Sequence, residues 1–194
     1  NTLVGFTSLD EVRQAMMSDG QQIRMLWPEE EAQLERLGEE ADLFNRAYQR
    51  FQNLQLQQDH ITAKDKSDLQ KRLDNLNIEL NRTLARTYNV DPDGLGFAAW
   101  LQSHSPFHWL VDFHGIMAQG GFDAVIGNPP YVEYRLVQSS YRFPQNYYLS
   151  EEADNLYAYC MERSIALLNH SSWFGMIVPV GVLSVDNSIS IRQE

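Results

Sequence analysis

The sequence has one cysteine, no long apolar run and a shortage of basic residues, and each of these narrows the class of protein. A single cysteine, Cys160, excludes an internal disulfide and is typical of a reducing compartment, so we expect a bacterial cytoplasm. The longest apolar stretch, residues 175–183, is too short to span a bilayer, and no N-terminal segment has the charged-then-apolar form of a secretory signal. We therefore expect no membrane partner.

Acidic residues outnumber basic ones by 26 to 15, which gives a formal net charge of −11 at pH 7. Nucleic-acid affinity depends largely on Lys and Arg side chains that neutralise phosphates, so this balance is the strongest objection to DNA binding by the chain. We therefore expect no specific binding of duplex DNA by the chain alone at physiological salt. With 194 residues, 43% of them hydrophobic, the chain is large enough to bury a core in one domain or two small ones.

The first half has the periodicity of two long helices. Pro28 suits a first helical position, and three glutamates follow it at the positive end of the helix dipole. Apolar residues then recur at spacings of three and four up to Leu54, and a second stripe of leucines lies within about residues 64–88. The polar stretch 55–63 is typical of a turn. We therefore predict an antiparallel helical hairpin over about residues 28–88, within a helical region of residues 1–96.

The second half has α/β character. Residues 122–127 and 174–178 have the apolar composition of strands, and residues 155–169 between them have helical spacing. A strand, a helix and a strand in this order predict one βαβ unit with parallel pairing. On the helix, Glu162 and Arg163 are predicted to form a solvated face.

The segment at residues 122–131 carries the strongest chemical signal of the chain. Asn128 follows the first strand at its carboxyl end, where open α/β sheets bind their ligands. Pro129 and Pro130 restrict φ and lack backbone N–H groups, so the Asn128 amide and the Pro129 carbonyl can be held as a rigid pair of acceptors. Tyr131 adds a flat face. Two acceptors beside a stacking surface suit a planar exocyclic amine, such as that of a base flipped out of a duplex.

Asn-Pro-Pro-Tyr after an apolar strand resembles the catalytic motif of amino-methyltransferases that use S-adenosylmethionine, above all the adenine-specific (N6) DNA methyltransferases. Its surroundings are similar to the large type IIG restriction-modification methylases and to related methylases of phage-exclusion systems. The similarity rests on Phe-His-Trp at 107–109, Gly-Gly-Phe-Asp at 120–123, Asn-Leu-Tyr at 155–157 and Glu-Arg at 162–163. It covers about residues 97–185 and, more loosely, the whole chain.

The resemblance implies a site-specific DNA adenine methyltransferase. In that family, Asn128 and the Pro129 carbonyl would accept hydrogen bonds from the target amine, Pro130 would set the loop, and Tyr131 would stack on the flipped adenine, for which it needs a ring and no hydroxyl. Accepting from both amine hydrogens draws the nitrogen toward a tetrahedral geometry, whose lone pair can attack the cofactor's methyl group. The alternative is a proline-rich exit from a strand with an asparagine cap.

The family's cofactor loop, Asp-Pro-x-x-Gly-x-Gly-x-Phe between a strand and a helix, is poorly matched here. Residues 91–97 are one residue short and follow a polar helix, so we interpret them as a helix-terminating turn. The resemblance assigns two positions to cofactor contact: Asn1, in a segment similar to the one that leaves the family's third strand, and Cys160, where a phenylalanine normally packs on the cofactor's adenine. Without the loop, we expect the chain alone to bind S-adenosylmethionine weakly or not at all.

The expected fold class is α/β, with a partial methyltransferase (Rossmann-like) sheet in the second half and the long α-helical hairpin in the first. By the resemblance, residues 97–194 are a partial catalytic region of a larger enzyme, and the basic target-recognition part lies beyond them. Double-stranded DNA would be a partner through the parent protein. The remainder of the parent chain would cover apolar sheet edges, so the chain alone is expected to self-associate or to cover them with its helices.

Two other functions stay open. Amino-methyltransferases that act on protein glutamine or on RNA share Asn-Pro-Pro-Tyr, and a helical interaction module with a vestigial motif would also account for the first half. The hairpin either braces the catalytic region or touches DNA, and its acidity favours bracing or self-association.

Three histidines suggest a metal site by their number alone. His104 and His108 are four residues apart, but Pro106 disrupts a shared helical face, and no cysteine or carboxylate completes a ligand set with His114. We expect no metal. Leu156, Tyr157 and Tyr159 on the predicted helix at residues 155–169 are interpreted as core residues rather than as contacts to a cofactor.

Overall fold

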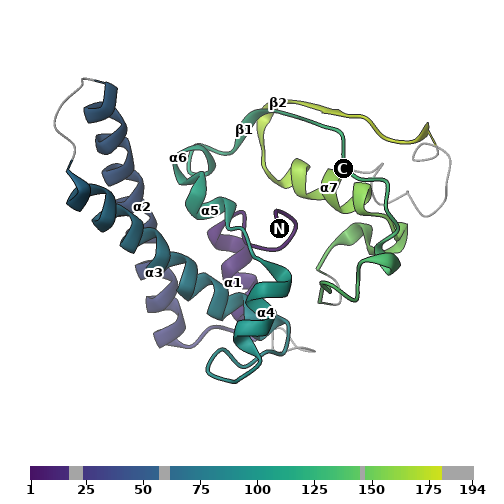
Figure 1. The fold of residues 1–194 in the computed structure, drawn as a ribbon, viewed down its shortest axis with the longest axis horizontal. Helices are drawn as coiled ribbons and strands as arrows, with labels where there is room; N and C mark the ends of the chain where they lie inside the picture. The colour runs from purple at the N-terminus through teal and green to yellow at the C-terminus, as the bar shows by residue number, and fades with distance from the viewer. Residues whose placement is uncertain (18–23, 57–61, 145–146, 181–194) are drawn as a thin grey trace. The chain divides into compact units, whose positions relative to one another are not determined.

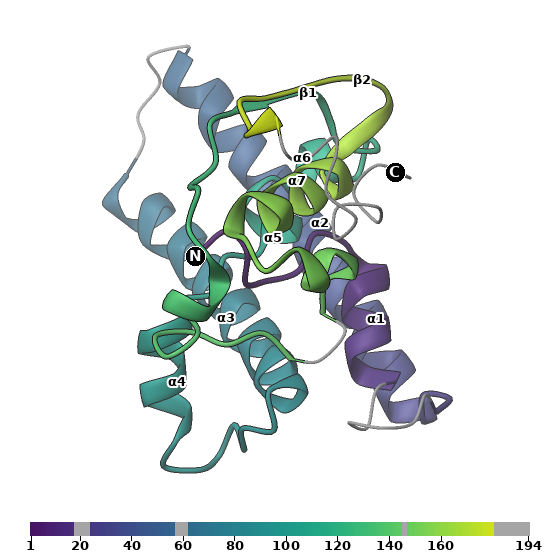
Figure 2. The same cartoon turned by 90° about the vertical axis from the view of Figure 1, so that its right-hand side faces the viewer.

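The computed structural model describes residues 1–17, 24–56, 62–144 and 147–180. Figures 1 and 2 show the ribbon from two sides. The α-helices are α1 (Leu9–Met17), α2 (Pro28–Leu56), α3 (Ala63–Thr87), α4 (Phe97–His104), α5 (Trp109–Asp112), α6 (His114–Met117) and α7 (Leu156–Ala166). The strands are β1 (Phe122–Gly127) and β2 (Leu168–Met176), and two 3₁₀ turns are η1 (Tyr134–Leu136) and η2 (Leu149–Ala153). No described helix is long and apolar enough to cross a membrane.

The chain divides into two compact units. The helical unit consists of Gly5–Phe97 and His108–Gly115, and the motif unit consists of Asn1–Val4, Ala98–Phe107 and Ile116–Glu194. The first unit contains α1, α2, α3 and α5, and the second contains both strands and α7. The predicted boundary between residues 96 and 97 stays a prediction. Contacts assign residues 1–4 to the motif unit and residues 108–115 to the helical unit.

The helical unit is built on α2 and α3, which confirms the two long helices. Pro28 begins α2, and Thr62 caps α3 in a reciprocal pair with Asp65, whose backbone N–H donates to the Thr62 hydroxyl oxygen over 3.2 Å. Arg36 on α2 pairs with Glu79 on α3 over 3.2 Å, as an antiparallel hairpin requires. The predicted turn at 55–63 lies mostly outside the described residues.

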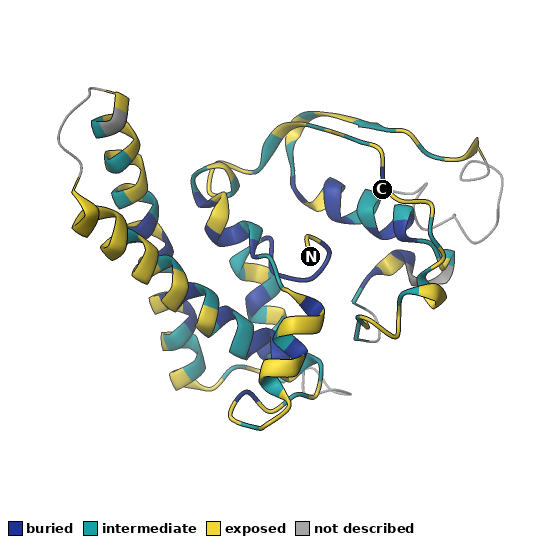
Figure 3. Cartoon of the chain, in the orientation of Figure 1, coloured by how far each residue is buried: buried dark blue, intermediate teal, exposed yellow. Residues whose placement is uncertain are grey.

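Buried residues of the hairpin lie only in the part that is remote from its turn. There, α1 packs against both long helices, and Figure 3 colours the helices by how far their residues are buried. The buried residues on these helices are Val12, Met16, Leu34, Leu37, Ala41, Phe44, Leu76, Leu80, Thr83, Leu84 and Ala85. The predicted apolar stripe continues further toward the turn, but Tyr48 is exposed and Leu54 and Leu69 are only half-buried. The stripe therefore makes a core over only part of its length.

The turn after α3 ends the helix, as predicted. Asn89 has a left-handed backbone (φ 57°) just beyond the last helical residue, a common way for a helix to stop. The Asp91 carboxylate then accepts from the Asp93 backbone N–H over 3.0 Å, and the Gly94 N–H donates to the Asp91 carbonyl over 3.0 Å. Residues 91–97 are thus a local turn between two helices.

The motif unit contains a two-stranded parallel sheet with α7 as the connection between its strands. The predicted βαβ order is confirmed, and β2 begins at Leu168 rather than at residue 174. Ala124 pairs with Trp173 and Gly127 with Met176, after an irregularity that follows the Phe122–Leu168 pair. Both views show the strands side by side (Figures 1 and 2). This register brings the end of β1, where the motif begins, level with the end of β2.

Gly121 allows the two strands to approach at their start. Its φ is +113°, and a Cβ atom there would lie 2.5 Å from the Leu167 carbonyl oxygen and 2.9 Å from the Leu168 carbonyl carbon. These neighbours are backbone atoms, which cannot swing aside. The glycine next to β1 is therefore required by strand pairing.

An aromatic cluster forms the core of the motif unit. Leu3, Tyr148, Leu156 and Tyr159 are buried together, and Cys160 packs against them. The interpretation of the apolar face of α7 as core is confirmed for Leu156 and Tyr159.

The expected solvated face of α7 is wrong. Arg163 is 6% exposed, and its guanidinium lies 5.4 Å from the centre of the Tyr148 ring and donates to the Tyr148 hydroxyl over 3.2 Å. Glu162 accepts from the backbone N–H groups of Leu149 and Ser150, each over 2.8 Å. Both charged side chains are held by a turn that is close in space and separated in sequence, which helical periodicity does not reveal.

Candidate active site at the Asn-Pro-Pro-Tyr loop

The predicted motif lies in a loop that leaves β1 and is held beside the end of β2. The Ile177 N–H donates to the Gly127 carbonyl over 3.0 Å, so pairing of the two strands continues to the residue before Asn128. At Gly127 itself, a Cβ atom would lie 2.8 Å from the Met176 sulfur, which is part of a flexible side chain. The strand pair fixes the start of the loop.

The far end of the loop is attached to the start of α7. The Leu156 N–H donates to the Val132 carbonyl over 2.8 Å, and the Tyr134 N–H donates to the Asp154 carbonyl over 3.0 Å. Asn155 caps α7, since its side chain accepts from the Tyr157 N–H. Because β2, α7 and the loop are tied together by backbone hydrogen bonds, the four motif residues have a rigid support.

Tyr131 bridges the loop and the end of β2. Its hydroxyl lies 2.7 Å from the Ile177 carbonyl oxygen, to which it donates, and 3.3 Å from Asn128 Oδ1. Its ring is 50% exposed and meets the Tyr157 ring edge-on, with centroids 6.3 Å apart and an interplanar angle of 84°. The ring therefore keeps an open surface while its hydroxyl is anchored.

The other motif residues alternate between surface and interior. Asn128 and Pro130 are exposed, whereas Pro129 is buried. An exposed amide beside a half-exposed aromatic ring, on a backbone that two prolines stiffen, can bind a flat group that carries N–H donors. The structure thus brings Asn128 and Tyr131 into contact, and their catalytic roles, like those of Pro129 and Pro130, stay predictions.

The two residues assigned to cofactor contact belong to the same unit. Asn1 is exposed, and its side-chain oxygen accepts from the Leu3 N–H over 3.2 Å. Leu3 in turn belongs to the aromatic cluster against which Cys160 packs. Burial raises the pKa of the Cys160 thiol to about 11, so this side chain acts as a neutral packing group at physiological pH.

The described residues do not fit a complete S-adenosylmethionine site. The loop that would hold the methionine part of the cofactor requires a preceding strand, and residues 91–97 follow α3 instead. The Asp91 carboxylate is also used within its own turn, where it accepts from the Asp93 N–H. Asn1 and Cys160 by themselves offer no cradle for the cofactor's charged groups.

The three histidines lie in separate surroundings. His104 accepts from the Arg142 N–H over 3.2 Å, and burial lowers its pKa. His108 accepts from the Phe6 N–H over 3.2 Å and lies 3.0 Å from Asn81 Oδ1 with its other nitrogen. Burial also lowers the pKa of His114, and Asp42, 3.5 Å away, partly offsets this. Within the described ranges, no group of three or more His, Cys, Asp or Glu residues could hold a metal ion.

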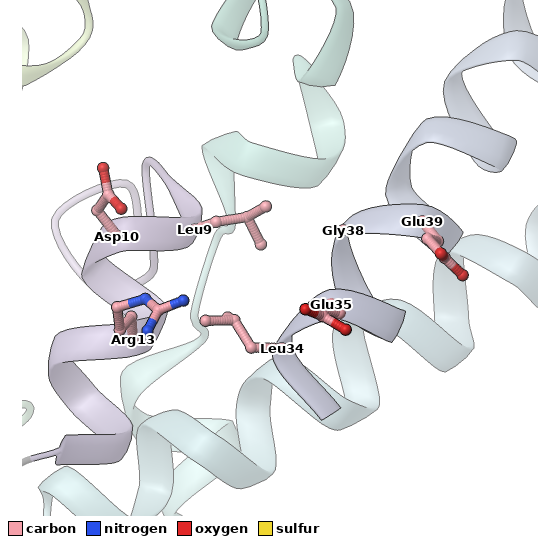
Figure 4. A pocket seen from close by; sticks show the side chains of 7 residues that line it. All are labelled: Leu9, Asp10, Arg13, Leu34, Glu35, Gly38 and Glu39. Carbon is pink, nitrogen blue, oxygen red and sulfur yellow. The ribbon is translucent and has the colours of Figure 1, made fainter. Parts of the chain in front are cut away.

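A concave feature lies between α1 and α2 in the helical unit (Figure 4). Its charged lining residues are Asp10, Glu35, Glu39 and Arg13, and Arg13 is already paired with Glu31 over 2.6 Å. The feature therefore offers an anionic cofactor no free cation. Its lining residues are Leu9, Asp10, Arg13, Leu34, Glu35, Gly38 and Glu39.

Sequence reasoning missed the partners that hold the motif. Ile177 contributes two backbone groups to the site, and backbone groups leave no signature in residue type. Tyr157 was interpreted as core, but it is half-buried and also forms the edge contact with Tyr131. The sequence does contain a signal for this position of Tyr157. Asn155 is a typical helix-capping residue, so it places Tyr157 in the first turn of the helix, where its ring can contact the loop that precedes the helix.

Comparison with known proteins gives two matches. The model of the Eco57I restriction-modification methylase family matches residues 42–193. A candidate type II restriction enzyme and methyltransferase of Methanocaldococcus jannaschii is 31% identical over 78 residues, which is 38% of this chain and 6% of that protein. No solved structure matches. The chain thus corresponds to a small part of the length of this relative.

Proposed function

The chain belongs to the Eco57I restriction-modification methylase family, and we propose that it carries the target-amine site of an S-adenosylmethionine-dependent DNA adenine N6-methyltransferase. The observation that supports the proposal most is the loop itself. An exposed Asn128 amide and a half-exposed Tyr131 ring lie in contact at the carboxyl end of β1, where ligands of parallel sheets bind. A flipped adenine has both features that this pair requires, namely a flat ring and an exocyclic amine.

Hydrogen bonding sets the direction of the amide. The Tyr131 hydroxyl has one proton, and the shorter of its two contacts, to the Ile177 carbonyl, takes it. The Asn128 amide is then best satisfied when its NH₂ group faces the hydroxyl oxygen, which turns Oδ1 outward. In that orientation Oδ1 and the Pro129 carbonyl accept from the two amine hydrogens of adenine, and the nitrogen lone pair is left for the methyl group.

The remaining roles follow from position. Tyr131 stacks on the adenine with its open surface, and Pro130 keeps the loop rigid. S-adenosylmethionine supplies an electrophilic methyl group when bound. The main loop that binds this cofactor is a feature of other parts of such enzymes. The methylase that carries this chain would act on duplex DNA in a bacterial cytoplasm as part of a restriction-modification or phage-defence system.

The test is methylation by the enzyme that carries this chain, with Asn128→Ala and Asn128→Asp. Loss of an acceptor that acts in the transition state lowers kcat by roughly a hundred- to a thousandfold. Because Asn128 is exposed and lies in a loop, melting of Asn128→Ala should match the wild type. Asn128→Asp keeps an acceptor and should lose less.

Gln102→Ala, which changes an exposed amide side chain of α4 outside the motif loop, is the matched control and should keep full activity. Adenine-containing duplexes, RNA and a glutamine peptide are compared as substrates. Transfer to RNA or peptide in preference to the duplex would overturn the assignment to DNA. Full activity of Asn128→Ala would leave the motif as a structural turn.

A further inference from the structure

Charge is segregated along the helical hairpin. Residues 28–42 of α2 contain seven carboxylates and a single arginine. The rest of the hairpin toward its turn, residues 45–56 of α2 and 63–75 of α3, is called the arm here, and it contains six basic side chains against three aspartates. The basic side chains are Arg46, Arg50, Lys64, Lys66, Lys71 and Arg72, which include every lysine of the chain. The arm is thus basic in a protein of net charge −11.

The arm's six basic side chains are exposed, and within the described residues none of them forms an ion pair. Several basic side chains elsewhere in the helical unit are paired instead. Arg13, Arg36 and Arg82 are paired with carboxylates over 2.6, 3.2 and 2.6 Å. The charges of the arm are therefore available to an external anion.

The two helices of the arm contribute to one electrostatic surface. Hydrogen bonds from Thr62 lower the pKa of Asp65, and the nearby charges of Lys64 and Arg50 lower it further. Lys64 is on α3 and Arg50 on α2, so cations from both helices act on the same carboxylate. A single carboxylate between them does not cancel the excess of positive charge.

Packing does not explain why the arm is so long. Burial on the hairpin ends at Phe44 and Leu76, and among the described residues of the arm none is buried (Figure 3). Each helix continues for roughly 18 Å beyond that point at the usual rise per residue. This length exceeds the Debye length of about 10 Å at 0.1 M salt, so the acidic half of the hairpin is screened from a ligand at the arm.

We propose that the arm binds the phosphate backbone of duplex DNA without regard to sequence. The inference rests on the proposed function, which makes duplex DNA the polyanion that the protein meets. Charge complementarity supports it, and exposed Gln52 and Asn53 add hydrogen-bond donors of the kind that contact phosphates. In this proposal the arm contributes affinity for the duplex, and the chemistry belongs to the Asn-Pro-Pro-Tyr loop. The acidity of the hairpin favours bracing of the catalytic region or self-association, but this argument applies only to its acidic half at residues 28–42 of α2.

The experiment measures binding of this chain to a labelled mixed-sequence duplex by fluorescence anisotropy, from about 50 to about 200 mM salt. If all six cations contact phosphates, affinity falls by about a thousandfold over this range. The triple variant Lys64→Gln, Lys66→Gln, Lys71→Gln binds more weakly at low salt, and its affinity falls by only about fortyfold. Binding does not depend on the sequence of the duplex.

The control is the triple variant Arg13→Gln, Arg36→Gln, Arg82→Gln. It removes the same net charge from half-buried or exposed positions outside the arm, where each charge is already paired. It should bind DNA as the wild type does, or slightly worse. Circular dichroism and thermal melts verify that both variants are folded.

Three results would overturn the inference: no binding by the wild type at low salt, equal losses in the two triple variants, or tighter binding to an RNA duplex than to DNA. The proposed function is judged separately. Asn128→Ala keeps the salt-dependent binding if the arm is the contact, whether or not methylation is lost. Failure of either claim is therefore visible without the other.

Discussion

Removing the hydroxyl of Tyr131 tests whether the ring alone is sufficient, as the motif suggested, or whether its anchor matters too. Tyr131→Phe deletes the donor to the Ile177 carbonyl, 2.7 Å away, and the contact with Asn128, 3.3 Å away. The ring and its edge contact with Tyr157 remain. A hydrogen bond of this kind at a partly exposed site is worth about 0.5–1.5 kcal/mol net.

If the whole of that energy serves to hold Asn128 in place, the rate falls by roughly two- to twelvefold. The loss should appear in kcat, because the stacking surface that captures the base is unchanged. Tyr131→Ala removes that surface as well, and should raise KM in addition. In Tyr131→Phe and in Tyr131→Ala, the loss in kcat should stay well below the loss expected for Asn128→Ala, in which the acceptor itself is removed.

The assay is steady-state methylation of an adenine-containing duplex by the enzyme that carries the chain, with thermal melts of each variant. Tyr131→Trp, which keeps an aromatic face without the hydroxyl, is the companion variant and should resemble Tyr131→Phe. An unchanged kcat in Tyr131→Phe would show that the hydroxyl does not orient Asn128. A loss of a hundredfold or more would show that it takes part in the chemistry.

Two further predictions concern the fold. Gly121→Ala should destabilise the chain by more than about 1 kcal/mol in thermal or urea unfolding, and by more than Gly120→Ala does. A Cβ atom at Gly121 would meet the backbone at Leu167, whereas a Cβ atom at Gly120 has its nearest neighbour at 4.0 Å. Equal effects of the two substitutions would contradict the close approach. Stability should also fall with acidification from about pH 7.5 to about pH 5.5, because burial lowers the pKa of His104 and His114, so that the unfolded chain binds more protons there than the folded one. Urea midpoints that stay constant or rise on acidification would refute this.

The helical half could be predicted in outline because helix periodicity is local. Pro28, the acidic first turn and the regular spacing of apolar residues all act within a few residues of one another. The same spacing could not show where burial stops. Tyr48 continues the stripe but is 41% exposed, because the depth of a core depends on how many helices meet at that place.

The candidate site was predictable where chemistry lies in consecutive residues. Residues 128–131 directly follow a strand. Their residue types alone predict a pair of acceptors and an aromatic ring, without information from any other part of the chain. The partners of these residues come from far along the chain. Ile177 is 46 residues from Tyr131, and its carbonyl group has no counterpart in residue type.

The sequence by itself thus determined the two long helices, the order of strand, helix and strand, and the position of the motif after the first strand, because each depends on neighbours within a turn or a strand. Only the tertiary structure decided that Glu162 and Arg163 are held by residues 148–150, that the Tyr131 hydroxyl is anchored, and that the arm's cations are unpaired within the described residues. The physical reason is the same in each case. Burial and pairing are set by groups that are distant in sequence and meet only when the chain folds.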